Sequence, residues 1–160
     1  SFEVIEKLTK MYPNNIVGMK DSGGDLDNML KITKLFDNFS LFSGSDSLAL
    51  KVCKRGGAGA ITATSNISGK LLSFIINNHK KEHAIQNFQE FQILQENIRK
   101  VLFTHEPVSG LKAFMSVNQN NAAWNRVNPP LNRIDNPKSH KTVIGLIELL
   151  KKMDALLAST

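Results

Sequence analysis

The sequence predicts an α/β fold with a parallel sheet, followed by a helical region. Two observations support this prediction. Over residues 1–78, short apolar runs alternate three times with amphipathic helical patterns, and from residue 79 onward the helical periodicity continues without another strand. Strand and helix pairs of about 25 to 30 residues imply right-handed crossovers between parallel strands. We therefore divide the chain into a sheet-containing part, 1–78, and a helical part, 79–160.

The first part begins with a helical pattern that stops at the turn around Pro13. Asp25 is a suitable N-cap for the next helix because its carboxylate can accept a hydrogen bond from the first helical turn. The glycine pair at 56–57 is expected to end the third helix. The expected elements are a helix over 2–11, strands over 16–20, 39–43 and 58–63, and a helix after each strand.

The second part is expected to hold three helices. Apolar residues keep helical spacing from residue 81 to 102, and Pro107 sits in the first turn of the next helix. Residues 118–140 are polar and rich in proline, which predicts an extended connection. The last amphipathic helix begins near Val143.

Composition narrows the class of protein. The chain has 160 residues, 41% of them hydrophobic, and a formal net charge of +6. No apolar run reaches the roughly 18 residues of a membrane span, and the first residues lack the pattern of a secretory signal. Cys53 is the single cysteine, so a reducing cytoplasm is expected. The lysines are scattered without a nucleic-acid motif, so we expect a basic solvated surface and no nucleic-acid partner.

The stretch 16–25 is the strongest candidate for chemistry. Lys20 and Asp21 stand where a buried strand should end, and Gly23 and Gly24 lead into a helix. Ligands of parallel α/β folds meet the chain at the carboxyl ends of the strands. An exposed lysine at a strand end is also common without any function, so the pattern alone leaves both readings open.

Three segments together resemble a known family. Residues 16–22 (IVGMKDS) are similar to the Schiff-base lysine segment of the dihydrodipicolinate synthase and N-acetylneuraminate lyase superfamily. Residues 43–46 (SGSD) and 56–67 (GGAGAITATSNI) follow in the order and spacing of that superfamily's last two barrel strands, and residues 126–131 (RVNPPL) are similar to its closing segment.

The resemblance implies the C-terminal part of a TIM (β/α)8 barrel, strands six to eight, followed by a C-terminal helical annex. The first five strands, the family's tyrosine relay and its carboxylate-binding motif would all lie before Ser1; Tyr12 does not match that relay. The family also implies a 2-oxo acid substrate, no cofactor or metal, and a homo-oligomer, by family resemblance a tetramer.

By this resemblance Lys20 is the catalytic residue and forms an imine with pyruvate or a related 2-oxo acid. Ser43, Gly44 and Ile61 would line the pocket beside the imine, and Ser22 and Asp46 would meet substrate hydroxyls. Each of these five has an alternative structural interpretation: a tight turn, a helix cap or a close-packed strand.

Other candidates are weaker. His79 and His83 could share a helix face, but no third metal ligand lies nearby in the sequence. Cys53 sits among apolar residues and is expected in the core. Lys70 and the glycines near the last two strands could form a barrel phosphate site, but no phosphate fingerprint accompanies them.

Substrate choice stays open. Ser47 and Ala63 stand where the sialic acid branch places a glutamate and a serine, which disfavours sialic acid; dihydrodipicolinate synthase-like and 2-keto-3-deoxy sugar-acid aldolase-like members are not separated. Two alternatives remain. The chain could be an inactive half-barrel or binding module that needs its missing N-terminal half or a partner, because three strands leave exposed edges. A weaker alternative is anion or nucleic-acid binding through net charge.

Overall fold

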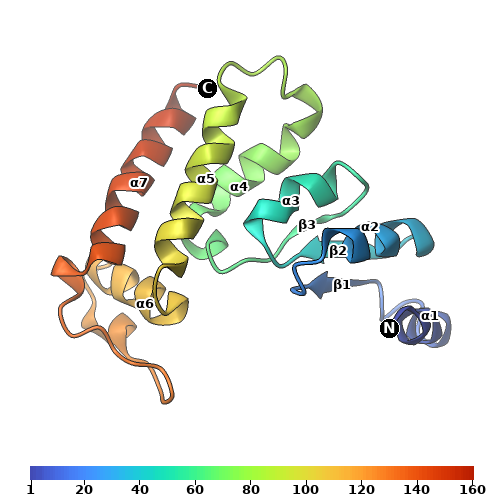
Figure 1. Cartoon of the computed structure of the whole chain (residues 1–160), viewed down its shortest axis with the longest axis horizontal. Helices are drawn as coiled ribbons and strands as arrows, with labels where there is room; N and C mark the ends of the chain where they lie inside the picture. Colours follow the sequence, from blue (N-terminus) through green and yellow to red (C-terminus); the bar gives the residue numbers. More distant parts are fainter. The chain divides into compact units, whose positions relative to one another are not determined.

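Three short parallel strands form the sheet of the protein (Figure 1). In the computed structural model, which describes residues 1–160, these are β1 (Gly18–Asp21), β2 (Ser40–Ser43) and β3 (Gly59–Ala60), paired in the order β1-β2-β3. Both pairs are parallel, and Lys20 is aligned with Phe42. Consecutive parallel strands are thus joined by helices, as the alternating pattern predicts.

Helices α1 (Phe2–Met11), α2 (Leu26–Leu35) and α3 (Asp46–Cys53) accompany this sheet. The Asp25 carboxylate accepts a hydrogen bond from the Asn28 backbone N–H at 3.1 Å, so the predicted N-cap of α2 is confirmed. One apolar cluster joins α2 and α3 to the sheet and contains, fully buried or nearly so, Met29, Ile32, Leu41 and Val52. Helix α1 contributes Phe2 and Ile5 to its margin.

The strands are shorter than the sequence pattern suggests. Ile16 donates its backbone N–H to the Tyr12 carbonyl and still belongs to the preceding turn, so β1 begins at Gly18. Strand β3 covers two residues instead of the predicted 58–63. The reason is that β2 ends at Ser43, which pairs with Ala60, so the residues after Ala60 have no strand partner in β2.

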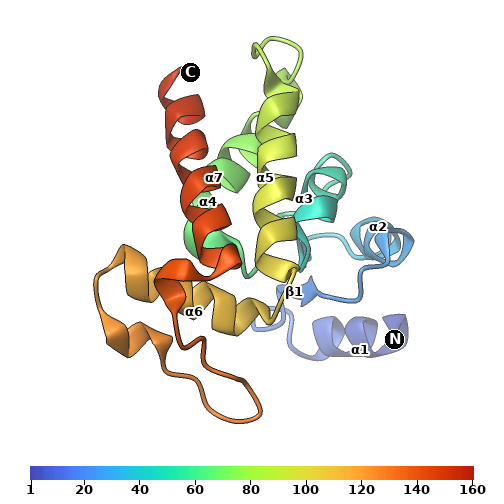
Figure 2. The same ribbon diagram turned by 60° about the vertical axis from the view of Figure 1, so that its left-hand side comes forward.

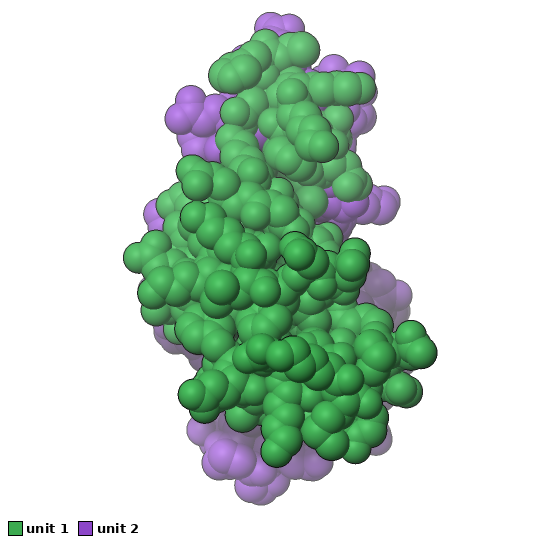
Figure 3. Space-filling view, turned by 90° about the vertical axis from the view of Figure 1, so that its right-hand side faces the viewer, with its two compact units in different colours: residues 1–62, 74–84 green, residues 63–73, 85–160 purple.

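The chain divides into two compact units (Figure 3), residues 1–62 with 74–84, and residues 63–73 with 85–160. Helix α4 (Ser65–Asn77) contributes to both units and leaves helical geometry at Ser68. The short 3-10 helix η1 (His79–Lys81) follows it within the first unit.

The second unit is helical and contains α5 (Phe88–Phe103), α6 (Pro107–Asn118) and α7 (Lys141–Ala158). Helices α5 and α7 lie side by side, and α6 contacts both (Figure 2). Its largest fully buried side chains are Phe91, Leu71, Ile98, Leu102, Leu146 and Val143. The three helices predicted for the second part of the chain are therefore present.

The start of α5 differs from the expectation. Apolar spacing predicts a helix from residue 81, whereas α5 begins at Phe88. Asn87 adopts a left-handed conformation with φ of 58°, which is incompatible with a right-handed α-helix. This residue therefore separates residues 81–86 from helix α5. The connection 119–140 holds only two short 3-10 helices, η2 (Ala122–Asn125) and η3 (Pro137–Ser139). None of the helices combines the length and apolar character that crossing a membrane would take.

Candidate functional site

Strand β1 presents Lys20 on the face of the sheet that α2 and α3 leave uncovered. Side chains alternate along a strand, and the neighbour Met19 packs against the apolar cluster beneath those helices. Lys20 therefore points the other way, and its side chain is exposed. The amine at the end of this side chain is available to a ligand that approaches the open face.

Asp21 fixes the loop that follows the lysine. One carboxylate oxygen accepts the backbone N–H of Gly23 at 2.7 Å, and the other accepts the side-chain amide of Asn28 at 2.9 Å. Asp21 is only 8% exposed. Gly24 follows with φ of 76°, a conformation that favours glycine. The connection from β1 to α2 is thus held by side-chain hydrogen bonds as well as by the helix cap.

The end of β2 lies directly against the end of β1. The backbone N–H of Gly44 donates to the Asp21 carbonyl at 2.7 Å. A side chain at position 44 would collide with the Ser22 hydroxyl and with the backbone of residues 21 and 22. Gly44 is therefore required for this close approach, which places exposed Ser22 beside it.

Ser43 has its hydroxyl engaged within the protein. Its Oγ donates to the Ser45 carbonyl at 2.9 Å and accepts the Ser45 backbone N–H at 3.1 Å. The side chain is fully buried and lies on the same face as Leu41. Ser43 thus shapes the turn between β2 and α3, and its side chain is on the opposite face from Lys20.

Asp46 and Ile61 come from the next two segments. The Thr62 hydroxyl donates to the Asp46 carboxylate at 2.8 Å, and both residues are nearly buried. Ile61 donates its backbone N–H to the Ser43 carbonyl at 2.9 Å, while its side chain is 49% exposed. The structure therefore brings Lys20, Ser22, Gly44 and Ile61 to the strand ends, with Asp46 held in place behind them.

Three residues at this site were missed by the sequence reading: Phe42, Thr62 and Asn28. Phe42 is aligned with Lys20 in the neighbouring strand and packs its ring beside Gly59. The register of β1 and β2 in the structure identifies Phe42, because it is the residue paired with Lys20. Thr62 and Asn28 carry no comparable signal, since their role depends on hydrogen bonds to residues 16 and 7 positions away.

The discounted residues occupy structural positions. Cys53 is buried, and burial raises the pKa of its thiol. His79 bonds through Nδ1 to the Ile76 carbonyl at 2.6 Å, whereas the side chain of His83 is 97% exposed. No group of three or more His, Cys, Asp or Glu side chains is arranged to hold a metal ion. Tyr12 lies in the exposed turn before β1.

Comparison with known proteins gives a family match over most of the chain. The model of the dihydrodipicolinate synthetase family matches residues 1–147. A 4-hydroxy-tetrahydrodipicolinate synthase of Buchnera aphidicola is 29% identical over 93% of this chain and 50% of its own length. The corresponding enzyme of Listeria monocytogenes is 43% identical over 46% of this chain and 25% of its own length.

Solved structures show the same fold. Dihydrodipicolinate synthase from Bacillus anthracis superposes with a TM-score of 0.72 at 21% identity, covering 92% of this chain and 49% of that one. N-acetylneuraminate lyase from Fusobacterium nucleatum gives 0.70 at 22% identity, covering 92% and 48%. The chain spans about half the length of the Buchnera aphidicola relative.

Proposed function

The chain belongs to the dihydrodipicolinate synthetase family, and on that basis we propose that Lys20 is the imine-forming residue of a pyruvate-type lyase or synthase. The exposed amine at the end of β1, on the face that the helices leave open, is the observation that supports this proposal best. The three strands then correspond to strands six to eight of a TIM barrel, and residues 79–160 to its helical annex.

The proposed reaction begins with addition of the neutral Lys20 amine to the keto carbon of a 2-oxo acid. The carbinolamine loses water to give a protonated imine, whose positive nitrogen accepts electron density from the carbon adjacent to the imine carbon. A proton leaves that carbon, and the resulting enamine attacks an aldehyde carbon; cleavage is the reverse. Hydrolysis of the imine releases product and restores the lysine, so no redox partner is needed.

The residues around the lysine suit binding rather than proton transfer. In the proposal, Gly44 lets the substrate approach the strand ends, and the exposed segment at Ile61 forms the adjoining wall. Ser22 is exposed beside Gly44 and can meet a substrate hydroxyl. We assign Asp46 and Ser43 a share in this pocket through the loop they hold, since both side chains are engaged within the protein.

The remaining requirements of the reaction fall outside this chain in the proposal. The relatives are about twice as long, and both β1 and β3 have a free edge in the three-stranded sheet. A full barrel would cover both edges and supply the proton relay and carboxylate site. The working unit in this proposal is a homotetramer of complete barrels in the cytoplasm, acting on a small 2-oxo acid.

Borohydride trapping tests the role of Lys20. Pyruvate and cyanoborohydride are added to the protein alone and to the protein co-expressed with the N-terminal half of the Bacillus anthracis enzyme, and the modified peptide is identified by mass spectrometry. We expect one reduced pyruvyl adduct on Lys20, strongest in the co-expressed sample. Lys20→Ala should abolish it, whereas Lys10→Ala, at an exposed lysine of α1, should not. An adduct that survives Lys20→Ala contradicts the proposal.

The same free edges favour a second candidate, a catalytically inactive half-barrel that functions as a binding module. The co-expression arm separates the two. If the N-terminal half associates with the chain but no Lys20 adduct forms in the complex, the binding module is favoured and the lyase proposal is lost.

A further inference from the structure

A cavity of about 400 Å³ opens between α4, α6 and α7 in the second unit. All of its lining residues belong to the second unit, and none belongs to residues 1–62, which hold Lys20. Ligand pockets in proteins run from about 300 to 1,000 Å³, so this one suits a small molecule.

The floor of the cavity is apolar. Phe114 and Met153 are 3% and 5% exposed, and Met115 and Leu150 are half-buried beside them. One wall is open because position 69 carries no side chain. A Cβ built on Gly69 would meet no atom within 4 Å apart from its chain neighbours and the nearby backbone of its own helix α4. The cavity can therefore accept an apolar group of several carbons without displacing protein atoms.

Two opposite charges stand on the rim. Lys70 and Asp154 are both exposed, and neither forms an ion pair or a hydrogen bond within the protein. Asn118 and Gln119 are also exposed and line the same cavity. A carboxylate near Lys70 and an ammonium near Asp154 would each gain a charge-assisted hydrogen bond.

We propose that this cavity binds a small amphipathic zwitterion, an α-amino acid with an apolar side chain. The side chain rests on Phe114 and Met153, the carboxylate meets Lys70, and the ammonium meets Asp154. A simple fatty acid would leave Asp154 close to an anion, and an alkylamine would leave Lys70 close to a cation. The zwitterion is the ligand that satisfies both charges and the apolar floor.

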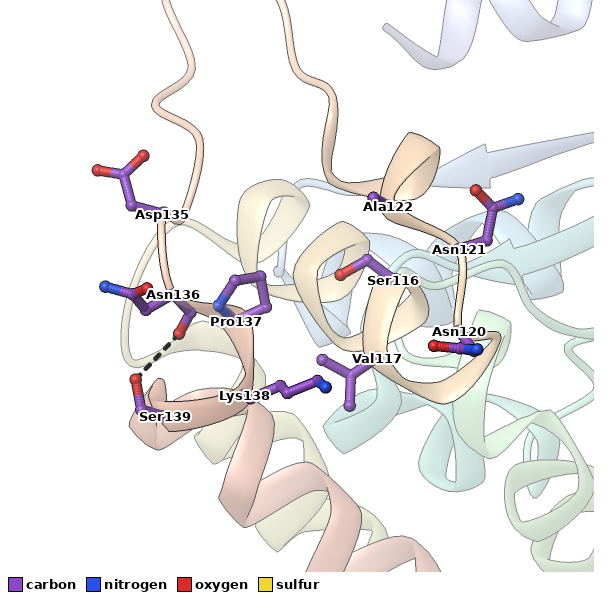
Figure 4. Close-up of a pocket in the computed structure, with 10 residues that line it drawn as sticks. All are labelled: Ser116, Val117, Asn120, Asn121, Ala122, Asp135, Asn136, Pro137, Lys138 and Ser139. Atoms are coloured by element: carbon purple, nitrogen blue, oxygen red, sulfur yellow. Dashed lines mark hydrogen bonds between the residues drawn. The ribbon is translucent and has the colours of Figure 1, made fainter.

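A second cavity of the same unit supplies a contrast (Figure 4). It measures about 550 Å³ and lies between the end of α6 and residues 135–139. Its lining includes exposed Lys138 and three asparagines, but none of its apolar lining residues is buried as Phe114 and Met153 are. Lys138 is an unpaired lysine that lines a cavity without an apolar floor, and it is therefore a matched control for Lys70.

Calorimetric titration of the protein with L-leucine tests the site, and three analogues dissect it. 4-Methylpentanoate lacks the ammonium, 3-methylbutylamine lacks the carboxylate, and glycine lacks the apolar side chain. We expect leucine to bind and each analogue to bind at least about tenfold more weakly. Absence of leucine binding up to about 10 mM, or binding of an analogue as tight as leucine, overturns the proposal.

Variants locate the binding. Gly69→Leu fills the cavity, and because leucine favours a helix more than glycine does, the fold should be retained. This variant should lose leucine binding. Lys70→Met and Asp154→Asn should each weaken leucine about tenfold or more, and Lys138→Met should leave it unchanged. Lys70→Met should not weaken the binding of 3-methylbutylamine, which has no carboxylate. Asp154→Asn should not weaken the binding of 4-methylpentanoate, which has no ammonium. Leucine binding that persists in Gly69→Leu, or that falls equally in Lys138→Met, contradicts the assignment.

Discussion

The Thr62 hydroxyl donates a hydrogen bond of 2.8 Å to the Asp46 carboxylate, linking the segment after β3 to the first turn of α3. Both residues are at most 9% exposed. A carboxylate in such a place depends on donors, because a buried charge without hydrogen bonds is costly. The pair therefore fixes the ends of β2 and β3 relative to each other.

Thr62→Val removes this donor and keeps the shape of the side chain. We expect a loss of unfolding free energy of about 1–3 kcal/mol, since the carboxylate stays buried without that bond. Urea denaturation followed by circular dichroism measures it. Thr62→Ser retains a hydroxyl, so its loss of unfolding free energy should be much smaller. Equal stability of Thr62→Val and the original protein would show that the bond is unimportant.

Asp21→Ala breaks two hydrogen bonds at once, to the Gly23 backbone and to the Asn28 amide. We expect a loss of about 1–3 kcal/mol in unfolding free energy, as for other buried polar groups that lose a partner. Asn28→Ala removes only the second bond and should cost less. In the double variant the Asn28 change should add little to the Asp21 change. Fully additive losses would mean that the two side chains act independently.

Gly44→Ala and Gly69→Ala should change stability in opposite directions. A methyl group at position 44 collides with the backbone of residues 21 and 22, so about 1–3 kcal/mol should be lost. At position 69, which follows the kink at Ser68, the methyl group enters open space, and up to about 1 kcal/mol should be gained because alanine restricts the unfolded chain more than glycine does. Thermal unfolding of both variants checks this. A stable Gly44→Ala would mean that the strand ends can separate without cost.

The sequence predicted the order of elements well because the signals that determine it are local. Asp25 caps α2 through a residue three positions away, and the apolar spacing of α7 is read along one helix. Element ends were predicted less well. Strand β3 stops where its partner β2 stops, and this limit is set by a turn at Ser43 that lies in another segment.

The candidate site shows the same contrast between residues with a local signal and residues whose role depends on other segments. Lys20 was identified from its own segment and a family resemblance; the structure shows it exposed in β1, and its catalytic role stays a prediction. The direction of the Ser43 side chain could not be read from sequence, because both faces of a short strand end carry small polar residues here. Asp21, Asn28 and Thr62 form bonds that exist only after the strands and helices have packed.

Cys53 should behave as a core residue in a thiol-reactivity assay. Burial raises the pKa of its thiol, which lowers the fraction of reactive thiolate near neutral pH. Reaction with an aromatic disulfide reagent at pH 8 should be at least roughly tenfold slower in the native protein than in urea. Ser159→Cys adds a thiol at an exposed position and should give one fast and one slow phase. A fast native reaction of Cys53 would contradict its burial.

The Lys54–Glu82 pair should make stability depend on acid pH. The Lys54 ammonium donates to both carboxylate oxygens of Glu82, at 2.8 and 2.7 Å, and this hydrogen bonding holds the pKa of Glu82 below its ordinary value of 4.5. A carboxyl group whose pKa is lower in the folded state stabilises the fold above its unfolded pKa, and this contribution is lost as the pH falls through the lowered value.

Lys54→Met should therefore be less stable than the original protein at pH 7, and the difference should shrink as the pH falls below 4.5. Urea midpoints of both proteins over this pH range measure the difference; a gap that stays constant into acid would mean that the Glu82 charge contributes nothing. Lys7→Met, at an exposed lysine of α1 without a partner, should show no such pH-dependent gap.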